Sequence, residues 1–139
     1  MKRIFIDSSV FYSAVYSARG YSRDLFLMAV RGEIVLVVSD FVLKEVRRNL
    51  AEAAPEILDV FDFMLELIPF ELAAPSKEDV IEAAQHVVLK DAPIIAAAKI
   101  SGVSMLVTLD KKHLLGKPEI TVYAGMPVVT PQDAFATLR

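Results

Sequence analysis

A short apolar run near the start of the chain, followed at once by an acid and two serines, most constrains the fold. Ile4, Phe5 and Ile6 form the run, which is typical of a strand buried on both faces of a parallel sheet. Asp7 stands where this strand ends, and the serines after it can cap a helix that continues through Val15. The stretch leaves two interpretations of Asp7 open: a helix cap, or a functional carboxylate at the sheet edge where α/β proteins bind ligands.

The composition sets the class of protein. The 139 residues suit one domain with a substantial core, so we expect a single domain over residues 1–139. There is no cysteine, which excludes disulfides, thiolate nucleophiles and zinc–thiolate sites. No apolar run is long enough for a membrane span and no signal peptide is visible, so we expect a cytoplasmic protein without a membrane partner.

Apolar strands alternate with helices along the rest of the chain. The patterns predict strands over residues 34–38, 69–72, 103–109 and 120–123, and Pro69 places the second of these at a sheet edge. They predict helices over residues 23–31, 40–53, 55–68, 76–88 and 92–101, and a C-terminal helix from Pro131. This alternation predicts an α/β fold, a three-layer α/β/α sandwich with a mostly parallel five-stranded sheet.

Four acids occupy comparable places in this pattern. Asp7 and Asp110 each follow a strand, and Asp91 precedes a helix of small residues that can pack close to the sheet. Glu45 lies on the helix after the second strand, where most glutamates are solvated. If all four converge at the carboxyl edge of the sheet, their repulsion raises their pKa values unless a cation is present. Mg²⁺ or Mn²⁺ prefers such oxygen ligands and can activate water against a phosphodiester.

Four segments, taken in order, resemble the acidic motifs of PIN domains: Ile6–Val10, Leu43–Val46, Lys90–Ala98 and Val107–Asp110. The resemblance covers essentially the whole chain, and it implies a parallel five-stranded α/β/α fold and an Mg²⁺- or Mn²⁺-dependent ribonuclease. It also implies a set of site residues. The catalytic and metal-binding acids would be Asp7, Glu45, Asp91 and Asp110, and the supporting hydroxyl groups those of Ser9 and Thr108.

Partners follow from the same resemblance and from the apolar pattern. Many small PIN domains are toxins of the VapC type, so the resemblance implies an RNA substrate and a cognate antitoxin. Apolar positions on several faces of the predicted helix 55–68 favour a homodimer, with contacts around Phe61, Met64 and Leu65 or the aromatics of the first helix. The alternative function is a catalytically silent PIN-like domain that binds RNA or protein.

Basic residues near these acids are the candidates for contacts with RNA. The net charge of −3 argues against binding through overall charge but leaves room for local basic groups. Such groups could be Arg48, Lys111, Lys112 and His113, together with Lys117, and a solvated loop is the equal alternative. Three other residues have simpler explanations: helix capping for Asp133, a structural or surface position for His86, and core or interface packing for Tyr12.

Two other enzyme classes lack the residues they need. A haloacid-dehalogenase-like phosphatase requires a second acid two positions after the first, where this chain has Ser9. A P-loop or dinucleotide-binding domain requires a glycine-rich turn after the first strand, which is absent here.

Overall fold

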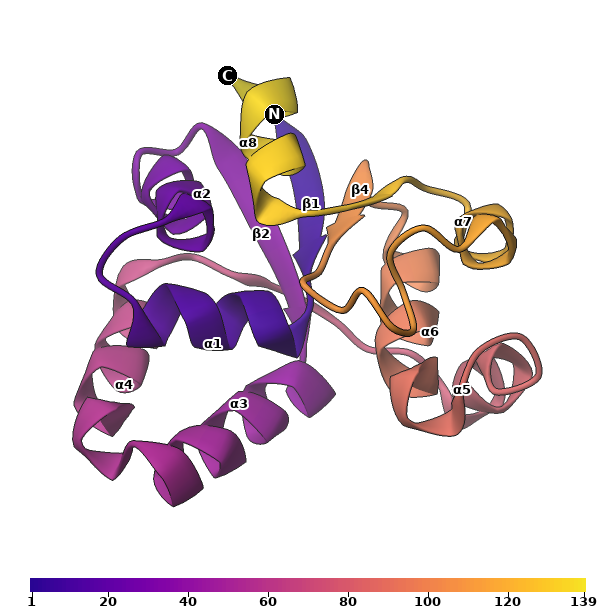
Figure 1. The fold of residues 1–139 in the computed structure, drawn as a ribbon, viewed down its shortest axis with the longest axis horizontal. Helices are drawn as coiled ribbons and strands as arrows, with labels where there is room; N and C mark the ends of the chain where they lie inside the picture. Colours follow the sequence, from indigo (N-terminus) through magenta and orange to yellow (C-terminus); the bar gives the residue numbers. More distant parts are fainter.

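The computed structural model describes residues 1–139 and shows a five-stranded parallel sheet with helices on both faces (Figure 1). The strand order is β3-β2-β1-β4-β5, and every neighbouring pair is parallel. The strands are β1 (Lys2–Ile6), β2 (Ile34–Ser39), β3 (Glu71–Ala73), β4 (Met105–Val107) and β5 (Val128–Val129). The predicted α/β/α sandwich with five strands is therefore confirmed, and the strand after Pro69 lies at an edge as expected.

Eight α-helices flank the sheet: α1 (Ser8–Tyr16), α2 (Tyr21–Val30), α3 (Asp40–Ala53), α4 (Leu58–Leu67), α5 (Lys77–Ala83), α6 (Ala92–Ser101), α7 (Pro118–Ala124) and α8 (Pro131–Leu138). In Figure 1, α1 to α4 lie on the left of the sheet and α5 to α7 on its right, while α8 packs beside α2. Two short 3₁₀ helices, Pro55–Ile57 and Leu89–Asp91, precede α4 and α6. No helix combines the length and the apolarity that crossing a membrane demands.

The core explains why β1 is central. The three apolar residues that end β1 are completely buried, because β1 has a strand on each side and a helical layer on each face. On the α1 face, the ring of Phe11 lies 5.0 Å from that of Phe26, 5.4 Å from Phe61 and 5.2 Å from Phe70, measured between centroids. On the other face, the buried alanines of α6 allow that helix to approach the sheet closely.

The prediction of a strand over residues 120–123 is wrong. This segment belongs to α7, and the fifth strand is β5, a few residues further on. The β-branched residues favoured a strand, but Pro118 at the start of the helix and Gly125, with φ 84°, at its end are the stronger signals. Burial follows the helical period: Ile120 and Ala124 are buried, whereas Val122 is 81% exposed.

Several boundaries also differ from the predictions. Helix α5 ends at Ala83 rather than near position 88, and α2 begins at Tyr21 with Gly20 as its N-cap. The strand predicted over residues 103–109 is shorter and covers only Met105–Val107. The Thr108 N–H still donates to the carbonyl oxygen of Val129, whereas the Leu109 N–H donates to the Ser9 side chain at the start of α1.

The expected dimer contacts are only partly available in the folded chain. Phe61 and Met64 face the core of their own chain and are buried. The apolar residues that α4 exposes are instead Val60, Phe63 and Leu67. The predicted contact around Phe61 and Met64 is therefore wrong, because the inner face of α4 is covered by α1 and the aromatic cluster.

The aromatic cluster predicts that two phenylalanines differ strongly in how much they contribute to the free energy of unfolding. Phe11→Ala removes a fully buried ring and should lower the free energy of unfolding by about 3–5 kcal/mol. Phe63→Ala, the matched control at a side chain that is 61% exposed, should change it by less than about 1 kcal/mol. Urea unfolding followed by circular dichroism measures both values, and similar losses for the two variants would contradict this description of the core.

Candidate active site

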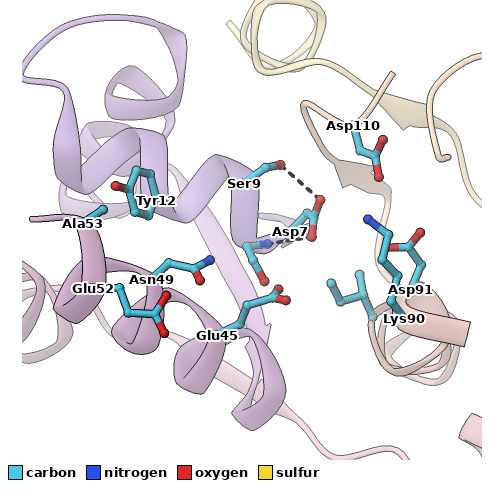
Figure 2. A pocket seen from close by; sticks show the side chains of 12 residues that line it. Asp7, Ser9, Tyr12, Glu45, Asn49, Glu52, Ala53, Lys90, Asp91 and Asp110 are labelled. Carbon is cyan, nitrogen blue, oxygen red and sulfur yellow. Dashed lines mark hydrogen bonds between the residues drawn. The ribbon is translucent and has the colours of Figure 1, made fainter. Parts of the chain in front are cut away.

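An open cleft of about 620 Å³ lies where the carboxyl end of β1 meets α3 and the start of α6. All four acids predicted from the sequence line this cleft: Asp7, Glu45, Asp91 and Asp110 (Figure 2). They come from four different parts of the chain, and the parallel sheet brings them to one edge, as expected for the carboxyl ends of its strands. Convergence on one cleft is thus a property of the structure, whereas their catalytic role remains a prediction.

Asp7 caps a helix and lines the cleft at the same time. Its backbone N–H donates to the carbonyl oxygen of Val107 at 3.0 Å, which extends the pairing of β1 with β4 by one residue. Its Oδ1 accepts the backbone N–H of Ser8 at 2.7 Å, at the first turn of α1. The structure therefore shows Asp7 as a helix cap, and its place in the cleft wall leaves the functional interpretation as a prediction.

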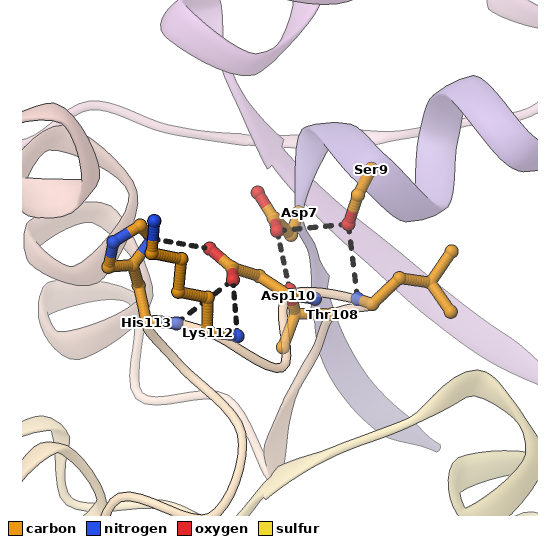
Figure 3. A network of polar contacts seen from close by, with 7 residues as sticks. Asp7, Ser9, Thr108, Asp110, Lys112 and His113 are labelled. Atoms are coloured by element: carbon orange, nitrogen blue, oxygen red, sulfur yellow. Dashed lines mark hydrogen bonds and ion pairs between the residues drawn. The ribbon is translucent and has the colours of Figure 1, made fainter.

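Two hydroxyl groups hold the other oxygen of Asp7 (Figure 3). Thr108 Oγ1 donates to Asp7 Oδ2 at 2.6 Å, and Ser9 Oγ donates to the same oxygen at 3.1 Å. These hydroxyl oxygens in turn accept backbone N–H groups, from Asp110 at 3.0 Å and from Leu109 at 3.1 Å. The chain leaving β4 is thereby fastened to the start of α1, and the carboxylate of Asp7 is fixed in orientation.

Asp110 organises the turn that follows it. Its Oδ1 accepts the backbone N–H groups of Lys112 and His113, both at 3.0 Å. Its Oδ2 lies 3.5 Å from Nδ1 of His113, so the imidazole is placed beside the carboxylate (Figure 3). The sequence prediction of a turn or short helix after Asp110 corresponds to a turn over residues 111–116.

The tightest group of potential metal ligands consists of Asp91, Asp110 and His113. One ligand atom from each lies within 4.8 Å of the other two. Asp7 and Glu45 line the same cleft but stand outside this group, and Glu45 lies 3.9 Å from the guanidinium of Arg48. The sequence suggests His113 only as a phosphate contact, whereas the structure places its imidazole among the potential metal ligands.

Burial raises the pKa of two of these carboxyl groups. For Asp7, 5% exposed, desolvation raises the pKa, the hydrogen bonds from Thr108, the Ser8 backbone and Ser9 oppose it, and the charge of Glu45 adds a smaller increase. For Asp91, 6% exposed, desolvation again comes first. Lys90 lowers the pKa of Asp91, and the charges of Asp110 and Asp7 raise it. Repulsion between acids, which the sequence led us to expect as the cause, is secondary to burial.

The chemistry of the donors fits a hard divalent cation. Asp91 Oδ2 is fully buried and has no hydrogen-bond partner, and such an acceptor normally requires a donor or an ion. Carboxylate oxygens, with one imidazole nitrogen, are suitable ligands for Mg²⁺ or Mn²⁺. A cation bound here would also remove the repulsion and the burial cost that raise the pKa of Asp91.

Three residues of the cleft wall are not among those expected from the sequence. Lys90, next to Asp91, and Asn49 and Glu52, on the helix of Glu45, all line the cleft (Figure 2). Asn49 and Glu52 follow Glu45 by four and seven positions, so helical periodicity could have placed them on the same face. Of the basic residues proposed for RNA, Arg48 pairs with Glu45, and neither Arg48 nor Lys111 lines the cleft.

The raised pKa of Asp7 predicts the behaviour of Asp7→Asn without metal. An acid whose pKa is higher in the folded than in the unfolded protein reduces stability when ionised, and the lost stability returns as pH falls through the folded pKa. Asparagine keeps an acceptor for the Ser8 N–H and removes the buried charge. The variant should therefore be at least as stable as the wild type at neutral pH. It should also lack the part of the pH dependence that arises between the raised folded pKa of Asp7 and the ordinary pKa of an aspartate in the unfolded chain.

Urea unfolding in chelator at several pH values measures this effect. Asp133→Asn, at an exposed acid in the first turn of α8, is the control and should leave the pH dependence unchanged. If Asp7 served only as a helix cap, its replacement would instead lower stability, by up to about 1 kcal/mol, at neutral pH.

Comparisons with known proteins agree with this architecture. The sequence model of the PIN domain family matches residues 3–112. The structure is similar to that of PAE2754 from Pyrobaculum aerophilum, with a TM-score of 0.68, 15% identity, and coverage of 99% of this chain and 95% of that one. No curated protein sequence matches this chain.

Two further solved structures share the fold. One is VapBC2 from Rickettsia felis bound to a promoter DNA fragment, with a TM-score of 0.66, 11% identity, and 92% and 98% of the two chains covered. The other is VapC20 from Mycobacterium tuberculosis, described as a sarcin-ricin loop cleaving toxin, with a TM-score of 0.55, 17% identity, and 78% and 91% coverage. The family match over most of the chain, together with the parallel sheet and its acidic cleft, shows that this protein belongs to the PIN-domain family.

Proposed function

We propose that this protein is a divalent-cation-dependent endoribonuclease that acts as the toxin of a toxin–antitoxin pair. The observation that carries the proposal is the convergence of four acids on one open cleft, with a buried and unpartnered oxygen on Asp91. Membership of the PIN-domain family supports it, as does the similarity in fold to VapC20, which is described as an RNA-cleaving toxin. The toxin role and the RNA substrate are the parts of the proposal that rest on these relatives.

The residues of the cleft have separable roles in this proposal. Asp91, Asp110 and His113 would hold the cation, and Asp7, whose carboxylate is fixed by Thr108 and Ser9, would help to hold it from the end of β1. When bound, Mg²⁺ or Mn²⁺ would lower the pKa of a water and offset negative charge on the reacting phosphodiester. Glu45 faces the same space from α3 and can accept a proton from the attacking water.

Lys90 adds a positive charge to the cleft. It stands next to Asp91, and it lowers the pKa of that carboxyl group. The other charged side chains of the cleft wall are acids, which repel a phosphate. The ammonium group of Lys90 therefore favours entry of the substrate. The cleft is open, which suits a polymer that must pass through rather than a small metabolite that would be enclosed.

Protein partners complete the proposal. Similar folds occur in VapBC2 and in FitAcB from Neisseria gonorrhoeae, which supports an antitoxin as the partner of this chain. We also propose a homodimer, since α4 leaves Val60, Phe63 and Leu67 exposed on one side. The mass of the protein in solution, measured by light scattering at micromolar concentration, tests this assembly, and a monomer would count against it.

The cleavage assay is the direct test of the proposed activity. Purified protein should cut single-stranded or structured RNA in Mg²⁺ or Mn²⁺, and chelator should stop the reaction. Asp91→Asn and Asp110→Asn should each reduce the rate by on the order of a hundredfold or more. Asp133→Asn, which changes an acid outside the cleft, should retain the wild-type rate.

Two outcomes would contradict this function. Activity that survives chelation would show that the reaction needs no divalent cation. Cation binding without cleavage of any RNA tested would favour the alternative, a silent PIN-like domain that binds RNA or protein. Melting curves with and without Mg²⁺ detect that binding independently of cleavage, because a ligand of the folded state alone raises its stability.

Thr108 predicts a graded effect on activity. Thr108→Val removes the hydroxyl group that donates to Asp7 at 2.6 Å and should slow cleavage by about 10–100-fold. Thr108→Ser keeps the hydroxyl and should retain most of the rate. Equal rates for the two variants, with both folded by circular dichroism, would show that the orientation of Asp7 does not depend on this bond.

A further inference from the structure

We propose that a second groove, beside the acidic cleft, binds phosphate groups of the RNA strand that the cleft cuts. The groove measures about 470 Å³ and lies between the turn after α5, the turn after β4 and the start of α7. Its walls carry the ammonium groups of Lys112 and Lys117 and the imidazoles of His86 and His113, and Glu119 is its single acid. The identification of the strand as RNA rests on the proposed function, whereas the preference for phosphate rests on the groove itself.

The positive charges of the groove are available to a ligand. Lys112 and Lys117 form no ion pair with any acid of the chain. This is notable in a protein with a net charge of −3, where acids outnumber lysines and arginines by 18 to 15. Local concentration of unpaired lysines in a concave surface is the arrangement that binds phosphate.

The groove and the cleft are linked through one residue. His113 lines the groove, and its imidazole also lies within 4.8 Å of ligand atoms of Asp91 and Asp110. The backbone N–H groups of Lys112 and His113 both donate to Asp110 Oδ1, so the acid in the cleft fixes the turn that forms the groove wall. Figure 3 shows Lys112 and His113 on the turn beside Asp110. A strand with one phosphate at the acids can therefore place a neighbouring phosphate against this wall.

The far wall of the groove is ordered by aromatic packing. The ring of His86 stacks on that of Tyr123, with centroids 4.0 Å apart and an interplanar angle of 16°. The ammonium of Lys99 lies 3.8 Å from the same tyrosine ring and adds a further positive charge behind it. His86, for which the sequence favours a structural or surface position, is thus held in place on the groove wall.

The structure also supplies a matched control. Lys111 is the immediate neighbour of Lys112, is exposed and lines neither the cleft nor the groove, so the proposal excludes it from the RNA contacts that the sequence suggests. Removing Lys111 changes the net charge of the protein as much as removing Lys112 does. The proposal therefore predicts different effects at adjacent lysines, which an effect of overall charge cannot produce.

The test is the affinity of the full chain for a short single-stranded RNA of mixed sequence, measured by fluorescence anisotropy in chelator. Lys112→Ala and Lys117→Ala should each weaken binding by roughly two- to fivefold, and each should reduce the slope of log affinity against log salt by about 0.7. Lys111→Ala should leave both quantities unchanged, and Lys117→Arg should restore the affinity that alanine loses.

Each outcome decides the proposal. Loss of affinity at positions 112 and 117 but not at 111, with unchanged melting temperatures, supports the groove. Equal losses at all three lysines, or no loss at any, would overturn it. Binding is measured without metal, so it does not depend on cleavage. If the lysines of the groove bind RNA but the protein cuts none, the proposed nuclease function fails and this inference stands.

Discussion

A buried carboxylate at the end of the central strand needs hydrogen-bond donors, and much of the cleft edge consists of the groups that supply them. Asp7 receives the Ser8 N–H on one oxygen and the hydroxyl groups of Thr108 and Ser9 on the other. Those two hydroxyls accept the backbone N–H groups that follow β4. The position of Asp110, and of the turn that Asp110 caps, therefore depends on how Asp7 is satisfied.

The second buried acid, Asp91, differs from Asp7 in its hydrogen bonding. The Oδ2 atom of Asp91 is buried without a hydrogen-bond partner. Burial raises the pKa of the Asp91 carboxyl group, and the charge of Lys90 opposes this increase. Asp7 accepts three hydrogen bonds, which fix the orientation of its carboxylate. Asp91 instead keeps a buried oxygen without a donor, so one side of the cleft edge is fixed by hydrogen bonds and the other has an unused acceptor.

Elements with strong local signals could be predicted from the sequence, and those decided by tertiary contacts could not. The run before Asp7 identified the central strand, and the acids that follow strands identified the cleft, because parallel strands end at a common edge. The β-branched residues at 120–123 favour a strand, but Pro118 and Gly125 bound a helix there, and the helix is what forms. No sequence pattern shows that the turn after Asp110 brings His113 close to Asp91, so the sequence suggests only a phosphate contact for His113.

The central claim is that Asp91, Asp110 and His113 hold a divalent cation in the cleft that Asp7 also lines. A crystal structure of the protein grown with Mn²⁺, with data collected for anomalous scattering, tests it most directly. The account predicts an anomalous peak at coordination distance, about 2.0–2.3 Å, from a carboxylate oxygen of Asp91 and one of Asp110. A cleft without a peak at millimolar Mn²⁺, or a peak coordinated only by residues outside the cleft, would contradict it.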